Sequence, residues 1–228
     1  MRDSMELEES KLALLLVDLQ EEHRRDVRFL AADYDVALAN AQKLLAAARA
    51  HNVLVLHGQY IRDFAKVPPR PFEMVGDNGE PVFSDSAAAA LVGLCPEVAP
   101  VFGEVVIVKN DASCFSEDGL AKGLKEQGIE WIVIAGAWTE ACVAATVRDA
   151  IANGFRVLLV KDACASGTRF MHRTAVLNLA NRLIGGGVAD AARAARILSG
   201  GSAEVWHLPS FVPFRFDADT VDTLYDSL

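Results

Sequence analysis

The sequence predicts an α/β fold whose parallel sheet is covered by helices on both faces. Short apolar runs alternate with longer segments of helical periodicity along the whole chain. The apolar runs are continuous rather than alternating with polar residues, as in Leu12–Val17 (LALLLV). A strand that is apolar on both sides is buried on both faces, which is typical of the parallel sheets of α/β proteins.

The continuous apolar runs predict the strands in chain order. They are Leu12–Val17, Val53–His57, Val105–Val108, Trp131–Ala135 and Arg156–Val160, with Glu204–Leu208 as a candidate last strand. Apolar residues spaced three and four apart predict the helices between them. These helices are expected over Asp33–Asn52, Ser116–Gln127, Glu140–Asn153 and Phe170–Ile184.

Two segments interrupt this alternation. Phe64–Asp85 contains prolines 68, 69, 71 and 81 and glycines 76 and 79, which predicts a long irregular loop. Such loops inside compact domains are often functional, and we expect this one to act as a lid over the active site. The C-terminal tail, residues 209–228, is too aromatic for a solvated tail and should pack on the domain or on a neighbouring subunit. Its aromatic residues are Phe211, Phe214, Phe216 and Tyr225.

The composition limits the classes of protein to consider. A length of 228 residues fits one domain, 1–228, with a core at about 11–208, and 52% hydrophobic residues provide a substantial interior. A net charge of −9 argues against binding to nucleic acid or anionic membranes. The four cysteines form no CxxC pair, and their spacing resembles neither a disulfide framework nor a zinc site. The polar, acidic first ten residues show no signal peptide, and no apolar run is long enough to span a membrane, so we expect a cytoplasmic protein.

Three residues with catalytic potential follow or end predicted strands. Asp18 follows the first strand, Lys109 follows the third, and Cys142 lies where the segment after Trp131–Ala135 enters a helix. In an open parallel sheet, ligands bind beyond the carboxyl ends of the strands. A thiol at the start of a helix lies in the positive end of the helix dipole, which favours the thiolate. A nearby Asp and Lys would add a base and a charge stabiliser.

Each of these residues also has an ordinary structural explanation. A cysteine in an apolar helix is often a small core residue, an aspartate that ends a strand is often a helix cap, and a lysine is often solvated. Spacing in the sequence alone leaves both explanations open.

Three segments of the sequence stand out: Ala13–Gln20 (ALLLVDLQ), Val105–Phe115 (VVIVKNDASCF) and Ile134–Ser166, which contains the most specific motif, G-x-x-T-x-x-C-V followed by T-x-R-D-A. These segments resemble the isochorismatase-like cysteine hydrolase superfamily, in particular its amidohydrolase branch. The similarity extends from about Lys11 to His207. It implies a three-layer sandwich with a six-stranded, mainly parallel sheet, and Asp18, Lys109 and Cys142 as the catalytic triad.

The resemblance also implies a mechanism. Asp18 would take the thiol proton, Cys142 would attack an amide carbonyl, and Lys109 would keep Asp18 ionised and favour the thiolate. The oxyanion would be bound by the backbone N–H groups of Trp138 and Cys142. The Ala137–Trp138 peptide would be cis.

The sequence departs from metal-dependent members of the superfamily. Nicotinamidases bind a metal through an Asp and two His after the second strand, whereas His57–Asp63 (HGQYIRD) here has no second His nearby. We therefore expect no metal and no cofactor. Some isochorismatases cleave a vinyl ether and lack the cysteine, so Cys142 favours amide chemistry.

Residues for substrate binding are less clearly marked. Arg62 and Arg70, in or beside the long loop, would clamp a substrate carboxylate or would be solvated. Gln20 would point into the pocket or cap the next segment, and Phe115 would form a pocket wall or belong to the core. Trp138 would narrow the pocket or offer a stacking face.

The sequence therefore predicts a metal-independent cysteine amidohydrolase that cleaves a small amide, ureido or carbamoyl compound through a thioester and releases ammonia or an amine. Two alternatives remain: hydrolysis of a vinyl ether or ester, and a non-catalytic metabolite-binding protein. The apolar composition and the aromatic tail also predict a homodimer or homotetramer, with the tail or the 64–85 loop crossing to the partner.

Overall fold

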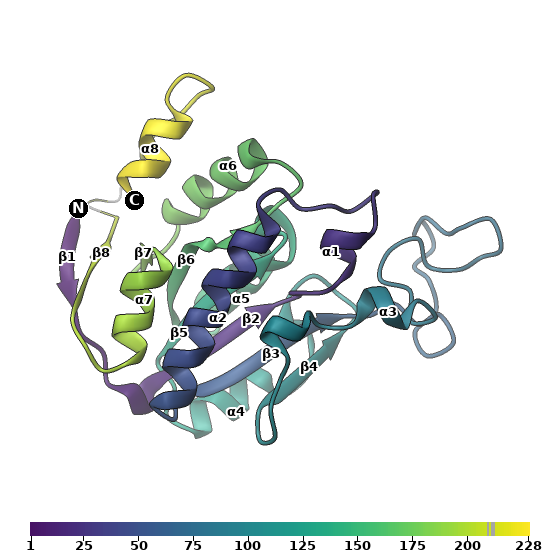
Figure 1. Cartoon of the computed structure of the whole chain (residues 1–228), viewed down its shortest axis with the longest axis horizontal. Helices are drawn as coiled ribbons and strands as arrows, with labels where there is room; N and C mark the ends of the chain where they lie inside the picture. Colours follow the sequence, from purple (N-terminus) through teal and green to yellow (C-terminus); the bar gives the residue numbers. More distant parts are fainter. Residues whose placement is uncertain (209, 211–212) are drawn as a thin grey trace.

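The predicted sheet runs through the middle of the molecule (Figure 1). A computed structural model describes residues 1–208, 210 and 213–228 of the chain. In this part of the chain the sheet has eight strands, in the order β1-β8-β7-β6-β5-β2-β3-β4. Their bounds are β1 (Arg2–Met5), β2 (Leu12–Val17), β3 (Leu54–Tyr60), β4 (Val105–Lys109), β5 (Trp131–Ala137), β6 (Arg156–Ala165), β7 (Gly187–Ala189) and β8 (Ala203–Trp206).

The expectation of six strands is wrong by two, because β1 and β7 lack the pattern that marks a buried strand. The polar strand β1 lies at the edge of the sheet, pairs only with β8, and exposes three of its four residues. The strand β7 has only three residues. Strands β2 to β7 are parallel to one another, whereas β8 is antiparallel to both β7 and β1. The mainly parallel α/β fold is therefore confirmed.

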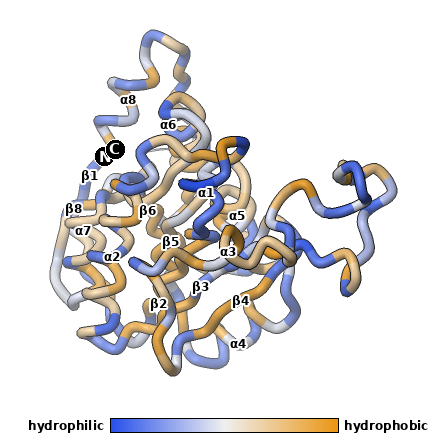
Figure 2. The backbone as a smooth tube through the Cα atoms, turned by 45° about the vertical axis from the view of Figure 1, so that its right-hand side comes forward, coloured by the Kyte–Doolittle hydropathy of each residue, from blue (hydrophilic) through white to orange (hydrophobic). Residues whose placement is uncertain are grey.

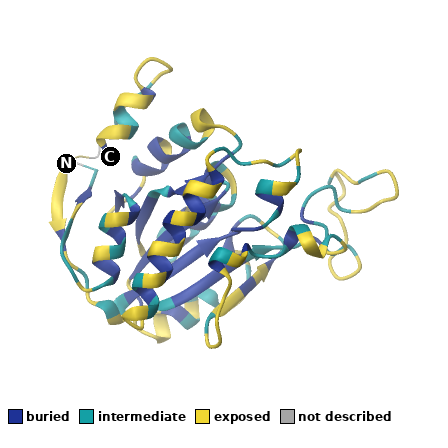
Figure 3. Ribbon diagram, viewed as in Figure 1, coloured by how far each residue is buried: buried dark blue, intermediate teal, exposed yellow. Residues whose placement is uncertain are grey.

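Helices cover both faces of the sheet. Their bounds are α1 (Glu22–Arg25), α2 (Tyr34–Ala50), α3 (Ala89–Val92), α4 (Leu120–Glu126), α5 (Ala144–Ala152), α6 (Arg169–Ala180), α7 (Ala191–Leu198) and α8 (Val221–Ser227). Residues of α2 and α7 join one apolar core, and residues of α4, α5 and α6 join the other. Successive residues of β2 alternate between the two cores, since side chains along a strand point to opposite faces. This arrangement makes every residue of β2 buried; Figure 3 shows the burial of the central strands, and Figure 2 shows that they are hydrophobic.

The order of the strands creates a crevice beside β2. From β2 the chain adds β3 and β4 on one side, and it then returns to place β5, β6 and β7 on the other side. Such a reversal leaves a gap between the connections at the carboxyl ends of the two central strands. The segments that follow β2 and β5 therefore meet at one place.

The long loop projects from the domain, whereas the described part of the tail packs against it. Most of Phe64–Asp85 is irregular, and it projects from the body of the protein at the right of Figure 1. The described part of the tail packs on its own domain, because Phe214, Phe216 and Tyr225 contact the core that contains α6. Pro209 and Phe211 lie outside the described residues. In the described part of the chain, no helix is long and apolar enough to cross a membrane.

A substitution at Gly136 tests how closely the backbone of β5 approaches that of β2. The φ of Gly136 is +141°, and a Cβ atom there would lie 2.0 Å from the carbonyl oxygen of Val17. We expect Gly136→Ala to lower the free energy of unfolding by about 3 kcal/mol, because backbone atoms would have to move. Gly123→Ala is the matched control: open space surrounds this residue in α4, and the change should stabilise by about 0.5–1 kcal/mol. Urea unfolding measures both, and a Gly136→Ala variant as stable as the native protein would contradict the close approach.

Candidate active site

A cavity of about 240 Å³ lies at the crevice beside β2. Its walls come from the ends of β2, β3 and β5 and from the segments after them. The residues that line it are Asp18, Gln20, Glu22, His23, Phe29, Tyr60, Phe83, Ala137, Trp138, Ala141 and Cys142. The structure thus brings Asp18 and Cys142 to one pocket, although 124 positions separate them in the sequence.

Lys109 and Asp18 form an ion pair behind the wall of this pocket. Nζ of Lys109 lies 2.7 Å from Oδ2 of Asp18, and both side chains are almost completely buried. The same ammonium group donates to the backbone carbonyl of Asp111 at 3.1 Å. Burial alone would lower the pKa of Lys109, but the neighbouring Asp18 and cysteine thiols raise it, so the ammonium stays charged. Burial raises the pKa of Asp18, and the charge of Lys109 opposes that rise.

Gly58 leaves the space in which this pair forms. The strand β3 lies between β2, which Asp18 follows, and β4, which ends at Lys109. A Cβ atom on Gly58 would lie 2.7 Å from Sγ of Cys114 and 3.4 Å from Oδ1 of Asp18. A side chain at this position would therefore crowd the carboxylate.

The thiol of Cys142 and the carboxylate of Asp18 line the same pocket, and Oδ1 of Asp18 is buried without a hydrogen-bond partner among the described residues. Cys142 lies in the single π-helical turn Thr139–Val143, which connects β5 to α5. Burial and the negative charge of Asp18 raise the pKa of Cys142 above its ordinary value, while Lys109 lowers it less. The expectation that the helix start and Lys109 favour a resting thiolate is therefore wrong, because desolvation and the adjacent carboxylate outweigh them.

The other three cysteines are fully buried, whereas Cys142 is partly exposed in the pocket. Burial raises the pKa of Cys95 to about 11 and the pKa values of Cys114 and Cys164 to about 12. Cys142 is therefore the cysteine that a molecule in the pocket can reach.

Hydrogen bonds of the Thr139 side chain hold the turn that carries Cys142 in place. The hydroxyl of Thr139 donates to the backbone carbonyl of Ala165 at 2.9 Å and lies 2.9 Å from Nδ1 of His172. Nε2 of His172 lies 3.0 Å from the hydroxyl of Tyr225 in α8. Because Thr139 uses its proton on Ala165, it accepts from His172, which leaves Nε2 to accept from Tyr225. The C-terminal helix thus supports the turn, a contact that the sequence did not predict.

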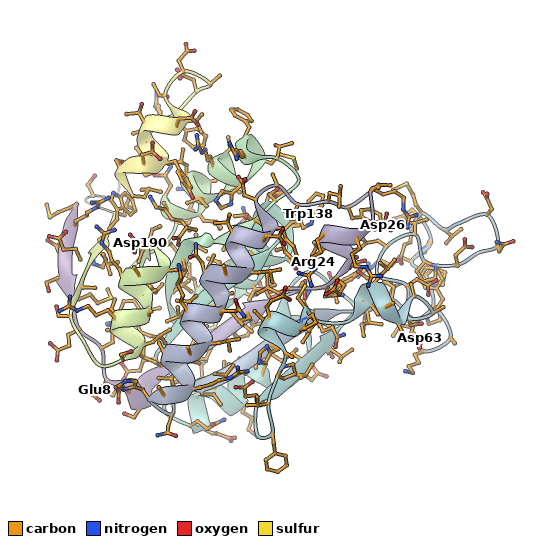
Figure 4. All side chains as sticks on the ribbon, in the orientation of Figure 1. Glu8, Arg24, Asp26, Asp63, Trp138 and Asp190 are labelled. Atoms are coloured by element: carbon orange, nitrogen blue, oxygen red, sulfur yellow. The ribbon has the colours of Figure 1, made fainter. Side chains whose placement is uncertain are left out.

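Trp138 lies where the sequence placed it, at the wall of the pocket. The Ala137–Trp138 peptide is cis, as the resemblance implied. Figure 4 labels Trp138 next to α1, where its indole N–H donates to Nδ1 of His23 at 3.2 Å. Burial lowers the pKa of His23 to about 4, so its imidazole is neutral and can accept this bond.

The other residues considered for substrate binding have structural contacts instead. Arg62 is buried and pairs with Glu73 at 2.7 and 2.8 Å, and Arg70 pairs with Asp111 at 2.8 Å. Neither arginine lines the pocket. The expectation that they clamp a substrate carboxylate is therefore wrong, because carboxylates of the protein already occupy them.

Gln20 and Phe115 are also structural. Gln20 lines the pocket, but its amide nitrogen donates to the carbonyls of Tyr60 and Val92 at 3.0 and 2.9 Å, and its oxygen accepts from Tyr60 N–H at 2.8 Å. These bonds join the end of β3 to the segment after β2. Phe115 packs against Phe155 in the core, with ring centroids 5.9 Å apart, and does not line the pocket.

The sequence missed five polar and aromatic residues of the pocket, and local signals could not have found them. Glu22 and His23 resemble the polar residues of a solvated helix, yet both are buried. Phe83 lies in the irregular loop, where no periodicity marks an inward-facing residue. The complete set of missed polar and aromatic residues is Glu22, His23, Phe29, Tyr60 and Phe83.

A possible metal-ligand set lies outside the pocket. Among the described residues, Glu21, Cys95 and Glu97 have ligand atoms close enough to share an ion. Arg24 already pairs with both carboxylates, at 2.5 Å to Glu21 and 2.7 Å to Glu97. This group therefore has the features of an ion-pair cluster rather than of a metal centre.

A mainly parallel α/β fold that places a thiol, a carboxylate and an ammonium group at its crevice has the groups that a hydrolase with a cysteine nucleophile needs. The isochorismatase domain model matches residues 12–193, and the chain belongs to this family. The chain is 35% identical over 159 residues to maleamate amidohydrolase of Pseudomonas putida, which covers 67% of this chain and 71% of that protein. It is 43% identical over 65 residues to N-carbamoylsarcosine amidase of an Arthrobacter species, 28% of this chain and 25% of that one.

Solved structures share the fold. A cysteine hydrolase from Pseudomonas syringae pv. phaseolicola superposes with a TM-score of 0.70 at 20% identity, covering 85% of this chain and 95% of that one. An isochorismatase family protein from Burkholderia thailandensis also gives 0.70, at 23% identity and with 85% and 97% coverage. The chain is accordingly a hydrolase of this family, and its named relatives act on C–N bonds outside peptides.

The electrostatics of Cys142 give a pH prediction. Because Asp18 raises the pKa of the thiol, Asp18→Asn should lower it by roughly one unit or more, since Lys109 then acts on the thiol alone. The pH midpoint for alkylation of Cys142 by iodoacetamide, followed by mass spectrometry, should therefore be lower in this variant than in the native protein. The native midpoint should lie above about 8.5, the ordinary cysteine pKa.

The control for this measurement is Asp111→Asn. Asp111 carries an exposed carboxylate that pairs with Arg70, so its removal should leave the midpoint unchanged. An unchanged midpoint in Asp18→Asn, with the variant folded, would show that the carboxylate does not act on the thiol.

Proposed function

We propose that the protein is a cysteine amidohydrolase that cleaves a small amide, ureido or carbamoyl compound through a thioester on Cys142. The observation that carries the proposal is the connected set of side chains in the pocket. Lys109 donates to Oδ2 of Asp18 at 2.7 Å, and Asp18 and Cys142 line the same pocket, where Oδ1 of Asp18 has no hydrogen-bond partner among the described residues. A nucleophile, a base and a charge that keeps the base ionised are the components that acyl transfer needs.

The first half of the reaction forms the thioester. The resting thiol is protonated, so Asp18 takes its proton as the sulfur attacks the substrate carbonyl and the S–C bond forms. Lys109 keeps Asp18 ionised until that moment. The backbone N–H groups of Trp138 and Cys142 stabilise the tetrahedral oxyanion, because they belong to the cis peptide and the turn beside the thiol.

The second half of the reaction releases both products. Asp18 returns its proton to the leaving nitrogen, the C–N bond breaks, and ammonia or an amine departs. Water then enters, Asp18 takes one of its protons, and the resulting attack on the thioester releases the acid. The proton returns to the sulfur of Cys142, so the site recovers its starting state.

The named relatives support amide chemistry over the alternatives. They include a maleamate amidohydrolase, an N-carbamoylsarcosine amidase and a ureidoacrylate amidohydrolase. The substrates in these names differ, so the shared element is a carbonyl bonded to nitrogen.

We also propose that the protein assembles as a homodimer or homotetramer. The edge strand β4 exposes Val105, Val106 and Val108, and Phe102 just before it is fully exposed. Apolar residues grouped on a sheet edge are typical of an interface.

Cys142→Ala tests the nucleophile. Removal of the sulfur leaves no atom to form the thioester, so ammonia release from small amides should fall by at least about 10³-fold while thermal unfolding stays close to that of the native protein. Cys95→Ala is the matched control, since it removes a buried thiol that does not line the pocket. Retention of activity in Cys142→Ala would refute the proposal.

Chelation tests the independence from metal. Because the proposed steps use only Asp18, Lys109, Cys142 and backbone N–H groups, dialysis against a chelator should leave kcat and KM unchanged. A loss of turnover that added zinc, manganese or iron restores would show that a metal takes part.

A further inference from the structure

The pocket beside Cys142 has aromatic walls and carboxyl groups but no basic side chain among the described residues that line it. Phe83 is the centre of the aromatic wall. Its ring centroid lies 4.7 Å from that of Phe29, 5.6 Å from that of Tyr60 and 6.1 Å from that of His23. The imidazole of His23 is neutral, because burial lowers its pKa to about 4. The walls therefore offer apolar contact and no positive charge.

The three cations that the sequence suggested for the site already pair with carboxylates of the protein. Lys109 donates to Asp18 and to the carbonyl of Asp111. Arg62 forms two hydrogen bonds to Glu73, and Arg70 pairs with Asp111. None of these three cations lines the pocket, so a substrate carboxylate inside it would not contact them at its walls.

Glu22 adds a second acidic group to the pocket, beside Asp18. Its side chain is buried, and its Oε1 accepts from the hydroxyl of Ser84 at 2.5 Å and lies 3.4 Å from the amide nitrogen of Gln20. Burial raises the pKa of Glu22 to about 7, with the charge of Asp18 adding to the rise and Ser84 opposing it. Nothing in the family resemblance assigned this residue a role.

A second cavity of about 510 Å³ adjoins the first and shares Glu22 and Phe29 with it. Its other charged residues are Asp26, Arg28, Asp77, Glu80 and Asp85. Arg28 is paired with Asp26 at 2.6 Å, so the remaining charge of this cavity is negative. Both cavities therefore oppose the approach of an anion.

We infer that the pocket selects amides with an uncharged, apolar acyl group and excludes those that carry a carboxylate, and that Glu22 is a specificity-determining residue. This inference rests on the proposed function and names its substrate class. A carboxylate in the pocket would lose its hydration, meet no positive partner and face two carboxyl groups, each of which disfavours binding. The name of the Pseudomonas putida relative denotes an amide with a carboxylate, so this chain differs from it in selectivity.

Two aldehydes of equal length test the inference without knowledge of the natural substrate. Butyraldehyde and succinic semialdehyde each accept the Cys142 sulfur at the carbonyl carbon, and the thiol proton passes to the oxygen to give a thiohemiacetal. They differ in that the second ends in a carboxylate. The measurement is the concentration of each that protects Cys142 from iodoacetamide by half, in the intact protein at neutral pH.

We expect the concentration of succinic semialdehyde that protects Cys142 by half to be at least about 100-fold higher than that of butyraldehyde. Glu22→Gln keeps the size of the side chain and the acceptor for Ser84, and it should reduce this ratio by at least about fivefold. Glu21→Gln is the matched control, because Glu21 pairs with Arg24 and does not line the pocket, so the ratio should stay unchanged.

The outcomes separate the two proposals. Equal protection by both aldehydes, or stronger protection by succinic semialdehyde, would overturn the inference while the reactive Cys142 of the proposed function remains. An unchanged ratio in Glu22→Gln would overturn the assignment of Glu22. Failure of both aldehydes to protect Cys142, together with no hydrolysis of any amide, would overturn the proposed function and the inference with it.

Discussion

The buried ion pair between Lys109 and Asp18 is the interaction on which the rest of the site depends. Either charge alone in this position would be strongly disfavoured, because removing one partner of a buried pair costs about 3–5 kcal/mol. The charge of Lys109 opposes the rise that burial causes in the pKa of Asp18, and the charge of Asp18 in turn raises the pKa of Cys142. The carboxylate of this pair raises the pKa of the Cys142 thiol, which disfavours a resting thiolate. In our proposal the thiolate therefore forms only as the sulfur attacks a substrate carbonyl.

The pair also explains two glycines inside strands, where glycine is normally unfavourable. Gly58 lies between the strands that carry the two charges, and any side chain there would crowd Asp18 and Cys114. Gly136 lets β5 approach β2 on the other side, against the backbone of Val17. The parallel register places both glycines opposite Val17, one residue before Asp18. The sheet is therefore shaped at this level by the space that the site requires.

The sequence predicted the fold well where local patterns reflect burial. A strand such as Leu12–Val17 is apolar on both faces because both faces are covered, and α2 repeats its apolar residues at helical spacing because one face meets the sheet. The strands β1 and β7 escaped prediction for the same physical reason. A polar edge strand and a three-residue strand bury too little to leave a pattern.

In the active site, too, some features follow from local sequence patterns and others only from contacts between distant segments. The sequence by itself determined that Asp18, Lys109 and Cys142 follow or end strands, and parallel strands place such residues at one edge of the sheet. Only the tertiary structure decided which charged side chains form ion pairs within the protein, because pairing depends on neighbours in space. Arg62 is occupied by a glutamate 11 positions away, which no local pattern reveals. The tertiary structure likewise turned Phe83, from an irregular loop, into a wall of the pocket, since contacts between distant segments rather than periodicity direct a loop side chain inward.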